Sequence, residues 1–107
     1  MAEANKPFSA ILSGSAATVY TCTTTTALVT LIQCSNVDTV VRTVTVQRTD
    51  HSNSDGVRRL AFGASIPIGE SRSLIDGALV LATGDIIQAF CDSASKVELN
   101  GSVLEIS

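Results

Sequence analysis

Short apolar runs rich in β-branched residues alternate with turn-forming residues along most of the chain. Residues 27–35 are apolar on both faces of an extended strand, which predicts a central strand covered on two sides. Residues 40–48 alternate instead, with Val40, Val44 and Val46 pointing one way and polar side chains the other. Because this spacing is typical of packed sheets, we expect an all-β fold, a single antiparallel β-sandwich or jelly-roll domain.

Turn residues divide the chain into further strands. The polar residues 50–56 predict the tip of a hairpin that joins residues 40–48 to residues 57–62. Near the end of the chain, Asn100-Gly101 predicts either a tight hairpin or a bulge. The other runs that predict strands are residues 8–12, 18–21, 71–75, 79–81, 86–91, 96–99 and 102–106.

The chain has the size of one domain. A chain of 107 residues buries roughly 65% of its unfolded surface, which is enough for a single core. Residues 1–7 are polar, contain Pro7 and lack apolar side chains that would hold them down. We therefore expect a short, flexible N-terminal arm, followed by a β-sandwich domain over residues 8–107.

Composition and charge narrow the range of partners. Hydrophobic residues make up 45% of the chain and charged residues only 16%, which favours association into a homo-oligomer. A net charge of -3 and a pI of about 4.8 argue against nucleic acid, because binding a phosphate backbone requires clustered Lys and Arg. No apolar run reaches the roughly 18 residues of a membrane helix, and the first residues lack a hydrophobic signal core. We expect a soluble chain, made in the cytoplasm, with no membrane partner.

The cysteines predict no cross-link. Cys22, Cys34 and Cys91 are odd in number and lack CxxC spacing, and two of them lie in apolar stretches. We expect buried free thiols rather than a disulfide or a zinc site.

His51 is the single histidine and the natural candidate for a general base. Asp50 and Asp55 flank it, but a catalytic triad also requires a nucleophile on a rigid turn, and the sequence has no Gly-x-Ser-x-Gly elbow. The same loop does not match a calcium loop: with Gly56 as the sixth residue, the twelfth is Phe62 instead of glutamate. We expect no catalytic residue, no metal and no cofactor, and therefore no enzyme.

Two Gly-acid pairs are the remaining candidates for ligand binding. Gly69-Glu70 and Gly84-Asp85 lack the flanking residues of phosphate-binding loops, so they predict turns.

The candidate contact residues are few, because aromatic residues make up only 4% of the chain and tryptophan is absent. Phe8 lies where the predicted arm meets the first strand, which is typical of a protein anchor. Arg58 and Arg59 form the only adjacent basic pair, and on a strand their side chains project to opposite faces. The predicted protein interface consists of Phe8, Arg58, Arg59 and Phe62.

Several stretches of the chain match one known family as an ordered set. They are residues 18–21, 34–38, 44–46, 66–71, 79–85 and 101–106. In these stretches the chain resembles the small β-sandwich virion structural proteins of tailed bacteriophages. The resemblance implies a non-enzymatic virion component that forms homo-oligomers and contacts other virion proteins, such as the major capsid protein or tail proteins. It implies a capsid decoration or cement protein, or a tail- or fibre-associated protein.

Two other functions remain as hypotheses. The chain is alternatively a carbohydrate- or receptor-binding module, with residues 49–56 as its candidate surface, because sandwich loops often carry such sites. A cupin-type enzyme shares the turn pattern, but it requires several metal-binding histidines and His51 stands alone.

Overall fold

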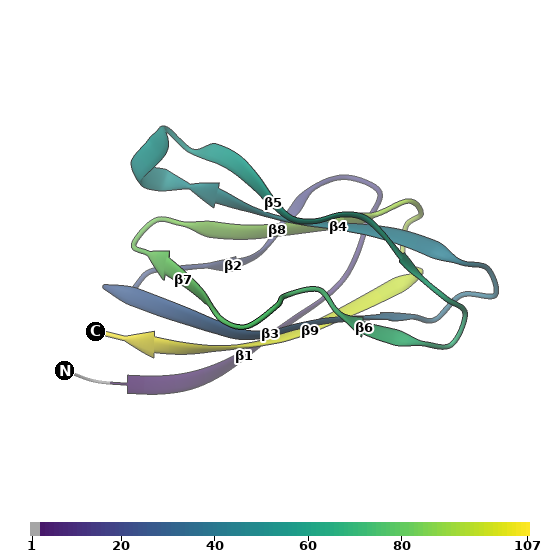
Figure 1. The fold of residues 1–107 in the computed structure, drawn as a ribbon, viewed down its shortest axis with the longest axis horizontal. Helices are drawn as coiled ribbons and strands as arrows, with labels where there is room; N and C mark the ends of the chain where they lie inside the picture. The colour runs from purple at the N-terminus through teal and green to yellow at the C-terminus, as the bar shows by residue number, and fades with distance from the viewer. Residues whose placement is uncertain (1–2) are drawn as a thin grey trace.

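Two antiparallel sheets pack face to face in the computed structural model, which describes residues 3–107 (Figure 1). The only helical segment in these residues is a three-residue 3-10 turn, η1, and no helix there is long and apolar enough to cross a membrane. The elements are β1 (Glu3–Ile11), β2 (Ala17–Thr21), β3 (Thr26–Asn36), β4 (Arg42–Asp50), η1 (His51–Asn53), β5 (Gly56–Ile66), β6 (Ser71–Ser73), β7 (Leu79–Ala82), β8 (Ile86–Cys91) and β9 (Val97–Ile106).

The chain passes repeatedly between the two sheets. Sheet A has the strand order β1-β9-β3-β6, and β7 also pairs with β3; sheet B has the order β2-β8-β4-β5. All strand pairs are antiparallel, and the hairpin predicted around residues 50–56 joins β4 to β5. The predicted all-β sandwich is confirmed.

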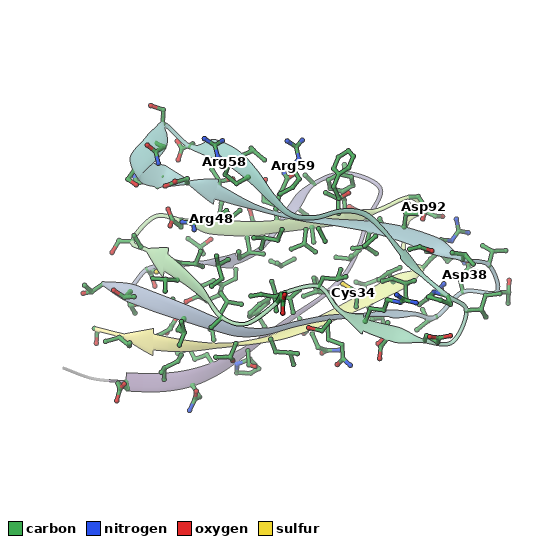
Figure 2. The ribbon with its side chains drawn as sticks, viewed as in Figure 1. Cys34, Asp38, Arg48, Arg58, Arg59 and Asp92 are labelled. Atoms are coloured by element: carbon green, nitrogen blue, oxygen red, sulfur yellow. The ribbon has the colours of Figure 1, made fainter. Side chains whose placement is uncertain are left out.

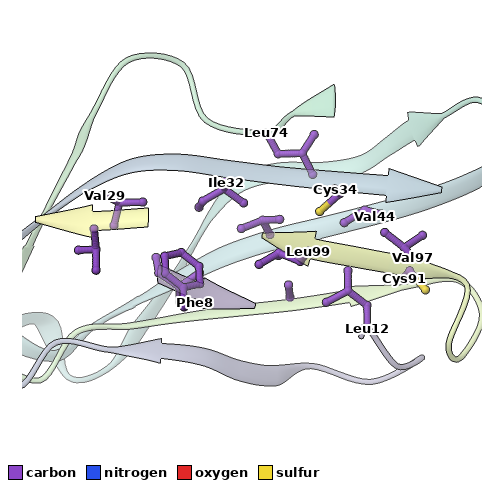
Figure 3. Packing of buried hydrophobic residues seen from close by; sticks show 14 of the residues in the cluster. Phe8, Leu12, Val29, Ile32, Cys34, Val44, Leu74, Cys91, Val97 and Leu99 are labelled. Atoms are coloured by element: carbon purple, nitrogen blue, oxygen red, sulfur yellow. The ribbon is translucent and has the colours of Figure 1, made fainter. Parts of the chain in front are cut away.

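Alternate residues of the central strands form the core between the sheets (Figure 3). In β9 the buried residues fall at every second position, which is the period of an extended strand. In β3 a register shift between Val29 and Leu31 adds one residue, so that Val29 and Ile32 both point inward. Leu31 is consequently 37% exposed, and the strand is covered on one face rather than on the predicted two.

The first residues differ from the predicted flexible arm. Glu3 to Pro7 belong to β1, and each of these residues pairs with a residue of β9, from Ile106 to Ser102. Backbone hydrogen bonds at the sheet edge hold a segment in which no apolar side chain is buried. Met1 and Ala2 lie outside the described residues.

Asn100-Gly101 is neither a hairpin nor a bulge in β9. The strand runs without interruption from Val97 to Ile106, and β1 pairs with it in an unbroken register. The reason is that Gly101 continues the inward alternation of Leu99 and Val103. The ring of Phe8, from β1, occupies the space that a side chain at position 101 would fill.

The three cysteines are free and buried, as predicted. Burial raises the pKa of the Cys34 thiol to about 12, with a further increase from the nearby Cys91. Because the thiolate is the reactive form, we expect Cys34 to be inert at neutral pH.

Candidate protein-interaction surface

Strand β5 forms one edge of sheet B and carries three of the four predicted contact residues (Figure 2). It pairs only with β4, and two register shifts interrupt this pairing. Bulges of this kind twist an edge strand and limit its pairing with further strands. Contacts at β5 are therefore expected to use side chains more than backbone groups.

Arg59 and Phe62 form the exposed part of this edge. Phe62 is 75% exposed, and the guanidinium carbon of Arg59 lies 5.7 Å from the centre of its ring. The backbone N–H of Gly63 donates to Thr45 Oγ1 at 3.1 Å, and Gly63 has a φ of 60°, which glycine adopts without strain. This anchored bulge fixes the position of Phe62. We call Arg58, Arg59 and Phe62 the β5 surface.

Arg58 lies beside this pair at the same edge. Its Nη1 donates to the carbonyl of Val57 at 2.9 Å, and its side chain is exposed. Arg58 lies opposite Arg48 and Arg59 lies opposite Gln47 in the ladder, a register that agrees with side chains on opposite faces of the sheet.

Phe8 lies apart from the β5 surface and inside the core. It is only 9% exposed, and its ring lies directly over Gly101 and 5.5 Å from the ring of Tyr20. A buried ring has no area left for a partner, so we no longer assign Phe8 to an exposed interface. The glycine in a strand was the one signal in the sequence that could have indicated this close approach.

A buried carboxylate, that of Glu105, was not predicted. Tyr20 donates its hydroxyl proton to Glu105 Oε2 at 2.5 Å, and Lys6 Nζ lies 3.0 Å from Oε1. The hydrogen bond from Tyr20, and then that from Lys6, hold the pKa of Glu105 below its ordinary value of 4.5. Burial, and then the same bond, raise the pKa of Tyr20. The charged form of Glu105 is therefore the one that the fold stabilises.

This arrangement predicts a specific acid sensitivity. A carboxylate with a lowered folded-state pKa stabilises the fold above its ordinary pKa, and this contribution is lost as pH falls through the folded pKa. We expect Tyr20→Phe to lower the melting temperature at pH 7, and this difference from wild type to shrink below about pH 4. Thermal melts followed by circular dichroism at pH 7 to 2.5 measure the difference; a difference that is constant over this range contradicts the prediction. Asp38 and Asp50 also have lowered pKa values, but both residues are present in wild type and in Tyr20→Phe, so their effects cancel in the difference.

Several side chains of the loop of residues 49–56 bond to one another. Asp50 accepts hydrogen bonds from Asn53 Nδ2 at 2.7 Å and from Ser52 Oγ at 3.0 Å, and these bonds lower its pKa. His51 Nδ1 lies 2.9 Å from Asp55 Oδ1. In the part of the chain that the structure describes, no three His, Cys, Asp or Glu side chains gather as a metal site would require.

Asp85 fastens this loop to the sandwich. The carboxylate is 1% exposed; Oδ2 accepts from Arg48 Nη2 at 2.5 Å and from the N–H of Ala82 at 3.0 Å, and Oδ1 accepts from the N–H of His51 at 2.8 Å. The ring of His51 covers Gly84, and a Cβ added to Gly84 would lie 2.6 Å from Cδ2 of His51. The turn predicted at Gly84-Asp85 is present, but its role as a clamp was not predicted.

Besides Phe62, exposed apolar side chains gather at the end of the sandwich that lies opposite the β4–β5 hairpin (Figure 1). Asn36 is buried beneath them, and its Nδ2 donates to the carbonyls of Val40 at 2.8 Å and Ile66 at 2.9 Å. These bonds connect the β3–β4 turn to the end of β5. The exposed side chains there, which we call the apolar tip, are Val37, Val40, Val41 and Ile68.

Known proteins resemble the chain in fold but not in sequence. No protein-family model matches the sequence, and no curated protein matches it. A solved structure described as Bacillus endospore appendages, a family of disulfide-linked pili, has a TM-score of 0.56 at 12% identity, covering 97% of this chain and 86% of the other. A protein in the structure of infectious bursal disease virus Gx strain has a TM-score of 0.50 at 11% identity, covering 97% of this chain and 29% of the other. The likeness is one of fold.

A third solved structure is a pentameric capsid protein from metagenomic phage sequences, with a TM-score of 0.49 at 18% identity. The alignment covers 95% of this chain and 62% of that protein. The chain thus spans less than two thirds of the two viral proteins, and most of the length of the pilus protein.

Proposed function

We propose that the chain is a non-enzymatic structural subunit of a bacteriophage virion, a capsid decoration or cement protein that stabilises the particle through protein–protein contacts. The strand order is the observation that carries this proposal. If β6 and β7 are counted as one interrupted strand, two four-stranded sheets interleave as β1-β9-β3-β6/β7 and β2-β8-β4-β5. This interleaving supports a jelly roll, an architecture that recurs in viral capsid domains.

The likeness to the infectious bursal disease virus and pilus structures supports the same assignment. Both alignments cover 97% of this chain, and the two structures are those of a pilus and of a virus. The pili are described as disulfide-linked, whereas all three cysteines of this chain are buried in its core. We therefore propose that its copies associate through non-covalent contacts.

The exposed apolar side chains support contact surfaces of this kind. Phe62 on the β5 surface and the side chains of the apolar tip lie on rigidly held turns and bulges. Exposed apolar groups in fixed positions are typical of interfaces, because little conformational freedom is lost on binding. The β5 surface pairs an aromatic residue with arginine, two of the residue types that are enriched in binding hot spots.

The location in a virion is tested on phage particles whose genome encodes the chain. Mass spectrometry of gradient-purified particles should detect it, and antibodies against the recombinant protein should label the head in immunogold images. Deleting the gene should lower the temperature at which the heads release DNA, and supplying the wild-type gene should restore it. Label on the tail supports a tail- or fibre-associated protein instead, and absence from the particles overturns the proposal.

The β5 surface is tested by Phe62→Ala. We expect self-association of the purified chain, measured by analytical ultracentrifugation, to weaken at least tenfold, because truncating an anchor residue typically removes more than about 1.4 kcal/mol. The melting temperature should change little, since Phe62 is 75% exposed. Val80→Ala, at a side chain that is 58% exposed on sheet A, is the matched control. Equal weakening by both variants argues against a specific role of the β5 surface.

A further inference from the structure

Strand β1 is attached to the rest of the molecule by few side chains. Of its nine residues only Phe8 is buried, and Glu3 to Pro7 are all exposed. Apart from its backbone pairing with β9, this first half is held by the Lys6 ion pair with Glu105 at 3.0 Å. The attachment of β1 thus consists of an edge-strand ladder, one ion pair, one buried aromatic ring and the partly buried Ala10.

The site that receives β1 is built entirely from later parts of the chain. The Phe8 ring lies so close to Gly101 that a Cβ added there would be 2.2 Å from Phe8 Cζ. The ring of Tyr20 lies beside the Phe8 ring. The acceptor of the Lys6 ion pair, Glu105, is also on β9. Because none of these groups belongs to β1, a β1 strand from a second copy would meet the same contacts.

The connection after β1 contains a short exposed stretch. Leu12 and Ser13 are fixed by backbone hydrogen bonds to residues 91, 95 and 97, whereas Gly14, Ser15 and Ala16 are exposed. A Cβ at Gly14 would meet no atom closer than 4.0 Å. A change of backbone direction at residues 14–16 would therefore move residues 3–13 as one unit. It would take Phe8 and Leu12, which is 3% exposed, out of the core, and the same segment of a second copy would fill both positions again.

Pro7 determines how copies can meet on this side. A proline within a strand has no N–H to donate, and it is accommodated where its nitrogen faces the free edge. Pro7 pairs with Ser102 of β9. With the Pro7 nitrogen on the free side, as this rule predicts, the free edge of β1 lacks a donor in the middle of the strand. Extension of sheet A by a strand added outside β1 is thereby disfavoured. Replacement of β1 by the β1 of another copy keeps every contact and meets no such obstacle.

We propose that in the assembled form β1 of one copy leaves its own sheet A and pairs with β9 of a neighbouring copy, with its Phe8 over the neighbour's Gly101. This proposal rests on the self-association proposed above. Exchange of an identical element replaces contacts within a chain by the same contacts between chains, so it joins copies at low free-energy cost. It gives a role in assembly to the N-terminal segment and to Phe8, although the ring is buried.

The test uses an engineered disulfide between paired positions. Ser9 and Asn100 are exposed Cα partners in the β1–β9 ladder, at a separation that suits a disulfide. The variant Ser9→Cys with Asn100→Cys is purified, separated into oligomer and monomer by size-exclusion chromatography with light scattering, oxidised, and blocked with N-ethylmaleimide. Non-reducing gels then show whether each bond lies within or between chains. The control, Gln33→Cys with Asn100→Cys, links β3 to β9, which are not exchanged.

The expected result is that the oligomer fraction of the Ser9 and Asn100 variant gives covalent dimers or larger species, while the control gives only monomers on the gel. An oligomer that yields only bonds within one chain overturns the strand exchange but leaves the proposed self-association intact. A chain that elutes only as a monomer overturns both. A control that also forms bonds between chains shows that the cross-links do not report exchange, and overturns this assignment.

Discussion

Asp85→Ala is expected to lower the free energy of unfolding by about 3–5 kcal/mol, the range found when one partner of a buried ion pair is removed. The carboxylate accepts hydrogen bonds from Arg48 and from two backbone N–H groups, so its loss leaves three donors without an acceptor. Arg48 Nε is already buried without a partner, which makes the guanidinium especially dependent on Asp85. Urea unfolding followed by circular dichroism measures the change.

Two further variants separate charge from hydrogen bonding at this position. Asp85→Asn retains one acceptor oxygen and removes the charge, and we expect an intermediate loss of stability. Asp55→Asn is the control: Asp55 is exposed, its φ of 58° is one that asparagine tolerates, and its bond to His51 lies at the surface. We expect this control to stay within about 0.5 kcal/mol of wild type. A loss at Asp85 no larger than that at Asp55 would show that the clamp contributes nothing.

Gly101→Ala is expected to destabilise the fold by up to about 3 kcal/mol, because the added methyl group overlaps the ring of Phe8. Gly101 does not have a positive φ, so alanine introduces no backbone strain and the effect is purely steric. Gly14→Ala is a matched control, since the nearest atom to its Cβ would lie 4.0 Å away. We expect that change to have an effect within about 0.5 kcal/mol. Urea unfolding measures both.

A double-mutant cycle tests the steric explanation. Phe8→Ala alone is expected to cost about 3–5 kcal/mol, as is usual for a buried phenylalanine. In that background Gly101→Ala should cost much less than in wild type, because the ring that the methyl group would meet is absent. If Gly101→Ala has the same effect in both backgrounds, the glycine is required for a reason other than the approach of Phe8.

Much of the local structure could be predicted from the pattern of residues. The β4–β5 hairpin, the central position of β3 and the buried state of the thiols were all predicted from short runs of sequence. Such features depend on the two-residue period of a strand and on the conformational preferences of turn residues, both of which are local. Arg58, Arg59 and Phe62 could be placed on one strand for the same reason, and the structure shows that their side chains are exposed there; their role in an interface stays a prediction.

The tertiary structure alone decided which residues meet. Tyr20 and Glu105 are separated by 85 residues, and Arg48 and Asp85 by 37, yet each pair shares a hydrogen bond. Phe8 was placed at a surface because a segment of polar residues precedes it, whereas the unpredicted pairing of β1 with β9 places it over Gly101. The sequence by itself determined most of the strands, the β4–β5 hairpin and the low content of charged residues, but neither the first half of β1 nor the continuity of β9. Only strand order and register decided the burial of Phe8, Asp85 and Glu105, because the contacts that bury them join elements far apart in the chain.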